Sequence, residues 1–146
     1  MSVQHRKLVN GDFFPWLGLY EQYGEHYGTP INDQVALRVW SWIESGELDG
    51  LIAVDDAGSL VGFAHYRRFV QPLTARRGVF LEDLFVVPSE RSHGVARALV
   101  DAVTAEAKAG GASLLQLSAR PDDELANGVY GAIAERSAWH SYETAI

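Results

Sequence analysis

The spacing of hydrophobic residues in the first third of the chain predicts a short strand and two helices. Residues 3–9 alternate weakly between apolar and polar side chains, which predicts a strand. Residues 13–27 carry large apolar side chains at intervals of three and four, the spacing of one face of a helix. Asp12 precedes this helix as an N-cap, and a Thr-Pro pair follows it. Asn32 then caps a second helix that runs to about residue 45.

Short apolar runs separated by turn residues follow, and they predict a change from helices to strands. A hairpin turn at residues 55–58 joins the first two runs, and a Gly-Gly pair ends a later helix. This antiparallel meander, followed by strands that alternate with helices, predicts an α/β (α+β) fold with a mixed sheet and helices on both faces. The predicted elements are strands at residues 51–54, 60–70 and 78–87, a helix at 94–109, a strand at 113–119, a helix at 122–134 and a strand at 139–145.

Length and composition indicate a folded single domain. The chain has 146 residues, and no repeat or linker-like stretch divides it, so residues 1–146 are predicted to form one domain. Hydrophobic residues make up 47% and charged residues 21%, the balance of a globular protein. The absence of cysteine excludes disulfides, thiolate metal sites and a cysteine nucleophile. The five histidines show no metal-ligand spacing, so no metal is predicted.

Net charge and hydropathy narrow the classes of partner. The formal charge of −7 argues against a nucleic-acid binder, which usually has a net basic footprint. No run of about 18 apolar residues predicts a membrane span. The basic residues near the N-terminus are not followed by the apolar stretch of a secretory signal. We therefore expect a cytoplasmic protein with neither nucleic-acid nor membrane partners.

The junction of a strand, a short loop and a helix around Gly94 has the features of a phosphate site. Glycine allows the backbone to approach a ligand closely. The first amides of the following helix have no partner within the helix and carry the positive end of its dipole. Such a helix start binds phosphate groups, and Arg91 adds a positive charge beside it. The sequence lacks the strings of a P-loop and of a dinucleotide-binding fold.

The run Arg91-Ser-His-Gly-Val-Ala96 resembles the signature of the GCN5-related N-acetyltransferase (GNAT) family, Arg/Gln-x-x-Gly-x-Gly/Ala. The resemblance covers about residues 50–146. It implies a GNAT-like fold, a central mixed and mostly antiparallel sheet of six to seven strands with about four helices on both faces. It also implies acetyl-CoA as co-substrate.

The resemblance assigns cofactor contacts to three stretches. Asp123 stands where the family commonly has Asn in the pattern Asn-x-x-Ala-x-x-x-Tyr, and a carboxylate still accepts a hydrogen bond from the cofactor arm. The other contacts implied are Leu84, Phe85 and Val86 beside the pantetheine arm, and Arg91, Ser92, His93, Gly94, Val95, Ala96 and Arg97 around the pyrophosphate.

Two residues are candidates for the chemistry. Tyr130 matches the family's tyrosine and is implied as the general acid that protonates the departing thiolate. The Glu82-Asp83 pair resembles the polyamine acetyltransferase branch, which makes Glu82 the substrate-side group, either as a base through water or as an ammonium site. On a regular strand the two carboxylates point to opposite faces, with Glu82 on the face of Phe80 and Leu84. Asp83 is then either a structural carboxylate or a second site group.

Several other residues have two possible roles. His65 and His140 lie on predicted strands and either face the cleft or have satisfied structural roles. The aromatic residues of the first helix either wall an amine site or belong to an amphipathic core helix. The arginines at positions 67, 68, 76 and 77 flank a hairpin and either meet a CoA phosphate or are solvated.

These features lead to an expectation for function. The leading hypothesis is direct transfer of acetyl from acetyl-CoA to a primary amine of a polyamine or diamine, an amino acid or an amine-bearing antibiotic. The alternatives are a non-catalytic acyl-CoA-binding module and an acetyltransferase for protein lysines or N-termini. The resemblance also implies a homodimer, with residues 139–146 as a candidate contact strand.

Overall fold

The computed structural model describes residues 2–146 and is built on a five-stranded sheet. The strands are β1 (Gln4–Lys7), β2 (Asp49–Val54), β3 (Leu60–Gln71), β4 (Arg76–Val86) and β5 (Leu114–Leu117), in that spatial order. Neighbouring strands run antiparallel except for β4 and β5, which are parallel. The predicted mixed, mostly antiparallel sheet is therefore confirmed, although it has five strands where six or seven are expected.

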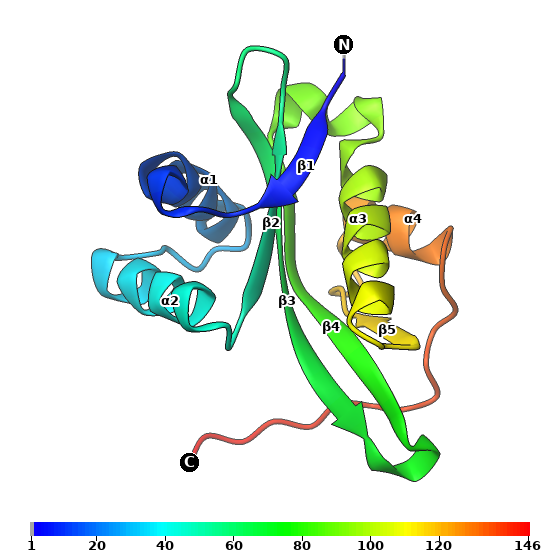
Figure 1. Ribbon diagram of the computed structural model, residues 1–146. Coiled ribbons are helices and arrows are strands. Elements are labelled where there is room, and N and C mark those ends of the chain that lie inside the picture. Colours follow the sequence, from blue (N-terminus) through cyan, green and yellow to red (C-terminus); the bar gives the residue numbers. More distant parts are fainter. Residues whose placement is uncertain (1) are drawn as a thin grey trace.

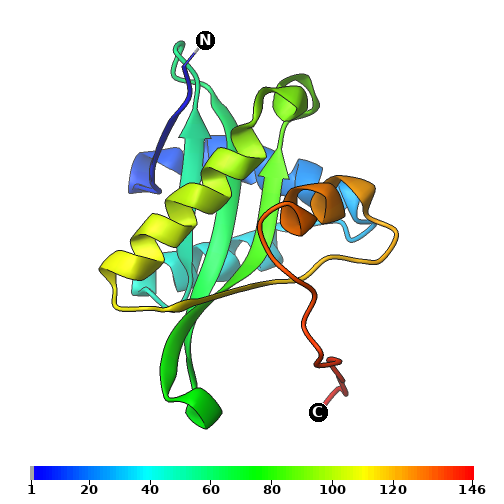
Figure 2. The same ribbon diagram turned by 90° about the vertical axis from the view of Figure 1, so that its right-hand side faces the viewer.

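Two helices cover each face of the sheet (Figure 1). Helices α1 (Phe13–His26) and α2 (Asp33–Ser45) lie on one side, and α3 (Val95–Ala109) and α4 (Glu124–Gly131) lie on the other. A view from the side shows α3 crossing the strands diagonally, with α4 beyond β4 (Figure 2). Asn32 caps α2 as predicted, because its side chain accepts a hydrogen bond from the Val35 amide. No helix in this part of the chain is long and apolar enough to cross a membrane.

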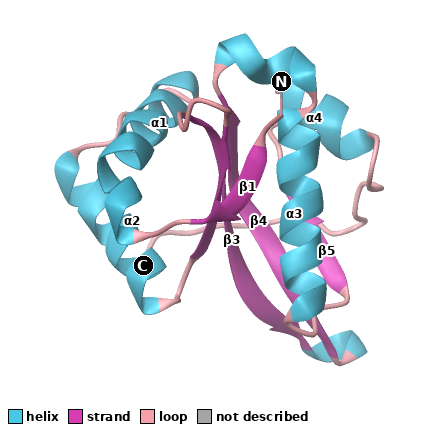
Figure 3. Cartoon of the chain, turned by 45° about the horizontal axis from the view of Figure 1, so that its top comes forward, coloured by secondary structure: helices cyan, strands magenta, loops and turns pink. Residues whose placement is uncertain are grey.

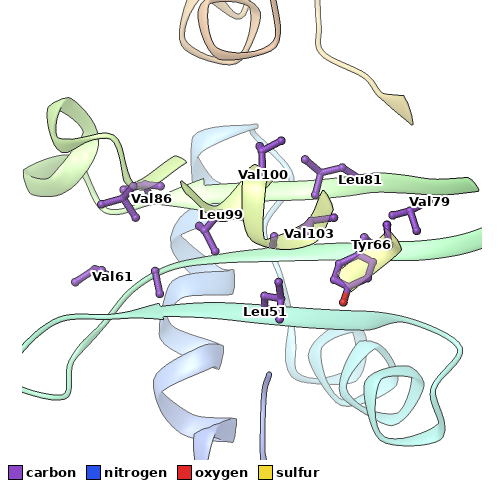
Figure 4. Packing of buried hydrophobic residues seen from close by; sticks show 13 residues of the cluster. Leu51, Val61, Tyr66, Val79, Leu81, Val86, Leu99, Val100 and Val103 are labelled. Carbon is purple, nitrogen blue, oxygen red and sulfur yellow. The ribbon is translucent and has the colours of Figure 1, made fainter. Parts of the chain in front are cut away.

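Each face of the sheet has its own apolar core. Strand residues that point toward α3 pack with Leu99, Val100 and Val103 of that helix (Figure 4). Residues that point the other way, such as Phe63 and Phe85, pack against the aromatic side chains of α1 and α2. The two layers of helices are separated by the sheet when the molecule is tilted forward (Figure 3). This arrangement follows from strands that are apolar on both faces.

One predicted element is absent and several differ in length. Residues 139–145, predicted as a last strand, form no strand and lie in an extended and exposed C-terminal segment. Within residues 2–146 this segment pairs with no strand, which accounts for part of the lower strand count. Strand β5 and helix α4 are each shorter than predicted, and the loop after β4 includes a short 3-10 helix, Pro88–His93. Asp12 precedes α1, but its carboxylate binds Arg6 and the Val9 amide instead of a helix amide.

Candidate functional site

Two adjoining cavities lie along β4, at the point where β5 leaves it. The larger has a volume of about 500 Å³ and lies between α1, β4 and α4. The smaller, of about 90 Å³, continues along the end of β4 toward the start of α3. The residues that line both cavities, and so mark their junction, are Tyr27, Leu84, Asp123, Ala126 and Tyr130.

The end of β4 has backbone groups that no strand pairs. Pairing between β4 and β5 ends at Leu81 and Leu117. On the other side, the Val87 amide donates to the Val61 carbonyl. Because the bonded positions of an antiparallel pair alternate, the backbone groups of Leu84 and Val86 point away from β3, toward the side that β5 has left. This free edge lines the smaller cavity.

The loop after β4 turns at a glycine whose conformation suits few other residues. Gly94 has φ +76° and is the N-cap of α3, and a Cβ there would have no neighbour within 4 Å. Arg91 is held against the strand, because its Nε donates to the Val86 carbonyl at 2.9 Å and its guanidinium lies 5.5 Å from the centre of the Phe85 ring. The positive charge beside the helix start is therefore fixed in place.

The remaining residues of the predicted pyrophosphate loop have different environments. Val95 is a core residue, and Ala96 lines the smaller cavity. Ser92 is exposed. His93 pairs with Glu90 at 3.0 Å, and Arg97 pairs with Asp101 at 3.2 Å on the surface of α3. The loop thus presents polar side chains on its outside and small apolar ones toward the cavity.

Asp123 joins α4 to α1. Its Oδ1 accepts the Ala126 amide at 3.1 Å, which caps α4, and its Oδ2 accepts the Tyr27 hydroxyl at 2.5 Å. Burial alone would raise the pKa of the Asp123 carboxyl, but these two hydrogen bonds, with Arg120 nearby, hold that pKa below its ordinary value. Asp123 is therefore an ionised group at the junction of the cavities.

Tyr130 lies on α4 and lines both cavities. Burial, with the carboxylates of Asp123 and Asp83 nearby, raises the pKa of Tyr130 to about 12. Unlike the hydroxyls of Tyr23 and Tyr27, the Tyr130 hydroxyl makes no hydrogen bond within residues 2–146. It is thus a protonated donor without an internal acceptor.

An extra residue in β4 corrects the predicted orientation of the two carboxylates. His65 pairs with Asp83 and Tyr66 pairs with Leu81, so Glu82 is a bulge without a partner on β3. The bulge breaks the alternation of side chains. Asp83 contacts His65, and Glu82 contacts Arg67, which lies two residues along β3 on the same face. The predicted opposite orientation is therefore wrong.

The same bulge places Leu84 on the other face. Leu81 and Leu84 both pack on the side of α3, although they are three positions apart and would face opposite sides of a regular strand. Glu82 keeps the face of Phe80, since Arg67 pairs with Glu82 at 2.7 Å and lies over the Phe80 ring. The predicted common face of Glu82 and Leu84 is therefore also wrong. Glu82 remains a partly exposed carboxylate that lines the larger cavity.

A series of hydrogen bonds runs behind the larger cavity, from the buried pair of Trp16 and His65 to the half-buried Asp83. Trp16 Nε1 donates to His65 Nε2 at 3.0 Å, and both side chains are fully buried. Tryptophan can only donate, so His65 Nε2 carries no proton and the histidine is neutral with its proton on Nδ1. This Nδ1 donates to Asp83 Oδ2 at 2.8 Å. Asp83 Oδ1 accepts the Tyr23 hydroxyl at 2.6 Å.

These hydrogen bonds decide between the two interpretations that the sequence left open for His65, Asp83 and the aromatic residues of α1. His65 does not line the cavity; its Nδ1 donates a hydrogen bond to the Asp83 carboxylate on the side away from the cavity. Asp83 binds side chains from β3 and α1 instead of nearby amides. Burial and the negative charge of Asp83 raise the pKa of Tyr23, and the same causes raise the pKa of Tyr20 to about 12. The rings of α1 both wall the larger cavity and pack in the core.

The role of Trp16 and that of Asp83 left no local signal in the sequence, because their bonding partners are distant in the chain. Two of the arginines that flank the β3–β4 hairpin form ion pairs within the protein. Arg68 pairs with Asp49 at 3.1 Å, and Arg67 pairs with Glu82. Within residues 2–146, no three acidic or histidine side chains gather as a metal site.

Comparisons with known proteins agree with this geometry. The model of the acetyltransferase (GNAT) family matches residues 16–133. A ribosomal-protein-alanine N-acetyltransferase from Brucella melitensis biovar Abortus 2308 has a similar structure, with a TM-score of 0.84 and 25% identity over 99% of each chain. A search of curated proteins found no match.

Two further solved structures share the fold at lower identity. An aminoglycoside 6'-N-acetyltransferase from Acinetobacter baumannii has a TM-score of 0.81 and 19% identity over 99% of each chain. The structure of AAC(6')-Iy in complex with the bisubstrate analogue CoA-S-monomethyl-acetylneamine has a TM-score of 0.80 and 24% identity, over 99% of this chain and all of that one. On the family match, which spans most of its length, the chain belongs to the acetyltransferase (GNAT) family, whose co-substrate is acetyl-CoA.

Proposed function

We propose that this protein transfers an acetyl group from acetyl-CoA directly to a primary amine of a small cationic molecule. The observation that carries the proposal is the meeting of two cavities at the hydroxyl-bearing side chain of Tyr130. One cavity runs along a free strand edge to a helix start, and the other is walled by tyrosines and carboxylates. The thiol and the amine would then enter from different sides and meet at Tyr130.

The smaller cavity suits the arm of CoA. Its wall includes the backbone of Leu84 and the amide of Val86, where an extended amide chain can pair as a strand would, while the Val86 carbonyl is already bonded to Arg91. In this proposal Phe85 packs behind that edge, and Asp123 lies at its inner end. The loop from Ser92 to Arg97 would hold the pyrophosphate through backbone amides at the start of α3, beside the fixed charge of Arg91.

The larger cavity suits an amine. Glu82 is the carboxylate there with solvent access, and we assign it the binding of a substrate ammonium group in exchange for Arg67. Polyamines, amino acids and amine-bearing antibiotics all carry such groups. The aminoglycoside acetyltransferases among the structural neighbours support the last of these.

A second candidate is acetylation of a protein N-terminus. The neighbour at 25% identity is a ribosomal-protein-alanine N-acetyltransferase, which favours this candidate over acetylation of lysine. A non-catalytic acyl-CoA-binding module is a third. A cytoplasmic location, where acetyl-CoA is available, belongs to the same proposal.

A panel of amines separates these candidates. Purified protein is mixed with acetyl-CoA and with spermidine, an aminoglycoside, single amino acids or a peptide with N-terminal alanine, and thiol release is measured. We expect release with at least one small polyamine or aminoglycoside. Release with the peptide alone would establish the second candidate, and release with none would contradict the proposed transferase.

Replacing Tyr130→Phe tests the assigned thiolate donor. We expect kcat to fall about 100-fold, near the lower end for loss of a general acid, with the KM for acetyl-CoA changed less than twofold. Because the pKa of Tyr130 is raised to about 12, the group stays protonated up to about pH 11. Wild-type activity should therefore show no alkaline decline from this residue below that pH, and an unchanged kcat in the variant would remove Tyr130 from the mechanism.

Replacing Gly94→Ala tests the pyrophosphate loop. The left-handed backbone costs a non-glycine residue about 1 kcal/mol, so we expect the loop to relax and the KM for acetyl-CoA to rise about fivefold. Gly58→Ala is the matched control, because Gly58 has φ +85°, equally open surroundings and a place in a remote hairpin turn. Equal KM values for the two variants would contradict the assignment.

The proposed homodimer uses the C-terminal segment. Trp139 and Tyr142 are 79% and 92% exposed there, and β5 is an edge of the sheet. Large exposed apolar side chains and an unpaired sheet edge are both features that favour association with a second copy. Sedimentation should give twice the chain mass of 16.1 kDa. A mass of one chain at every concentration would contradict the dimer.

A further inference from the structure

Two tyrosines on the wall of the larger cavity donate their hydroxyl protons in hydrogen bonds to carboxylates. Tyr23 donates to Asp83 Oδ1 at 2.6 Å, and Tyr27 donates to Asp123 Oδ2 at 2.5 Å. Both side chains come from α1 and line the cavity. A hydroxyl has one proton and two lone pairs. Each of these hydroxyl oxygens can therefore accept a hydrogen bond from a ligand in the cavity but has no free proton to donate.

This polarity favours a ligand that donates hydrogen bonds. A hydrogen bond from a hydroxyl to a carboxylate is roughly twice as strong as one between neutral groups. A ligand that needed the Tyr23 proton would have to break such a bond, whereas an amine N–H simply completes the coordination of the oxygen.

From this geometry we propose that Tyr23 accepts the proton of the attacking amine and passes its own proton to Asp83. The proposal rests on the acetyl transfer proposed above and assigns its proton acceptor. Tyr23 is the group that touches the substrate nitrogen. Asp83 acts through Tyr23 and is a positioning residue, as is His65 behind it. Glu82 keeps the separate task of holding an ammonium group.

The step balances as follows for a neutral amine bound at Tyr23. The nitrogen lone pair forms the bond to the acetyl carbon, which makes the nitrogen protons acidic. Tyr23 takes one of them on its oxygen as its own proton moves to Asp83 Oδ1. The bond between carbon and sulfur breaks, and its electron pair leaves on sulfur as thiolate, facing the Tyr130 hydroxyl. Asp83, now neutral, returns the proton to solvent through Tyr23 after the amide departs.

The hydrogen bonds behind Asp83 explain why the proton goes no further than Asp83. His65 Nδ1 already carries a proton, which it donates to Asp83 Oδ2. His65 Nε2 is occupied by the Trp16 N–H at 3.0 Å. No site behind Asp83 can therefore receive a proton. The bond from His65 also fixes the carboxylate so that Oδ1 faces Tyr23.

Replacing Tyr23→Phe tests the proposal, because it removes the hydroxyl and keeps the ring. We expect kcat to fall about 100-fold, with the KM for acetyl-CoA changed less than twofold. Tyr66→Phe is the matched control: Tyr66 is a buried tyrosine on the opposite face of the sheet, in the core under α3, and it lines neither cavity. Its kcat should stay within about threefold of wild type.

The pH dependence separates a lost proton acceptor from a distorted site. The titratable groups that face Asp83 are His65 from β3, Tyr20 and Tyr23 from α1 and Tyr130 from α4. Without the internal acceptor, hydroxide must remove the proton. The deficit of Tyr23→Phe should therefore shrink as pH rises from 7 to 10.

Asp83→Asn, which preserves the size of the side chain, should show the same deficit and the same recovery with pH as Tyr23→Phe. The double variant should be no slower than either single one, because the two residues act as a unit. A deficit that stays constant with pH, or an unchanged kcat in Tyr23→Phe, would overturn the proposal. If the wild-type protein acetylates no amine, the proposed function has failed instead.

Discussion

One extra residue in β4 sets the geometry of the whole site. On β3 the alternation is regular, with Ala64 and Tyr66 facing α3 and His65 facing α1. On β4 the bulge at Glu82 shifts the alternation, so that Leu81 and Asp83 face opposite sides. Without it, Asp83 would share the face of Leu81 and enter the apolar core below α3. A buried carboxylate without partners is costly, and the bulge places it beside two donors.

The bulge also marks the place where the sheet opens. Pairing with β5 ends at Leu81, one residue before Glu82, and the chain beyond carries the free edge of Leu84 and Val86. The acidic groups therefore lie beside exposed backbone at the centre of the molecule. The α1 helix reaches the same place from the other side through Tyr23 and Tyr27. These two bonds connect α1 to β4 and to the cap of α4.

Local patterns predicted the scaffold, and long-range contacts made the site. The spacing of apolar residues placed α1 within one residue of its end, and the Arg91–Ala96 motif located the free edge and helix start. The bulge left no trace, because nearly every residue around Glu82 is apolar and either register looks regular. The bond between Trp16 and His65 spans 49 positions, which no local pattern reports. Residues 139–145 are predicted as a strand, but a strand requires a partner, and no strand among residues 2–146 pairs with them.

The polarity of the proposed site follows the movement of charge in the reaction. When an amine attacks a thioester, the nitrogen must lose a proton while sulfur gains an electron pair. The larger cavity places oxygen lone pairs on the nitrogen side, because Tyr23 and Tyr27 give their protons to Asp83 and Asp123. The junction places the free hydroxyl of Tyr130 on the sulfur side. The same residue type thus serves as acceptor or donor, and the presence of a carboxylate behind the ring decides which. With no cysteine to carry the acetyl group, this opposition of acceptor and donor across a few side chains supports a single direct transfer.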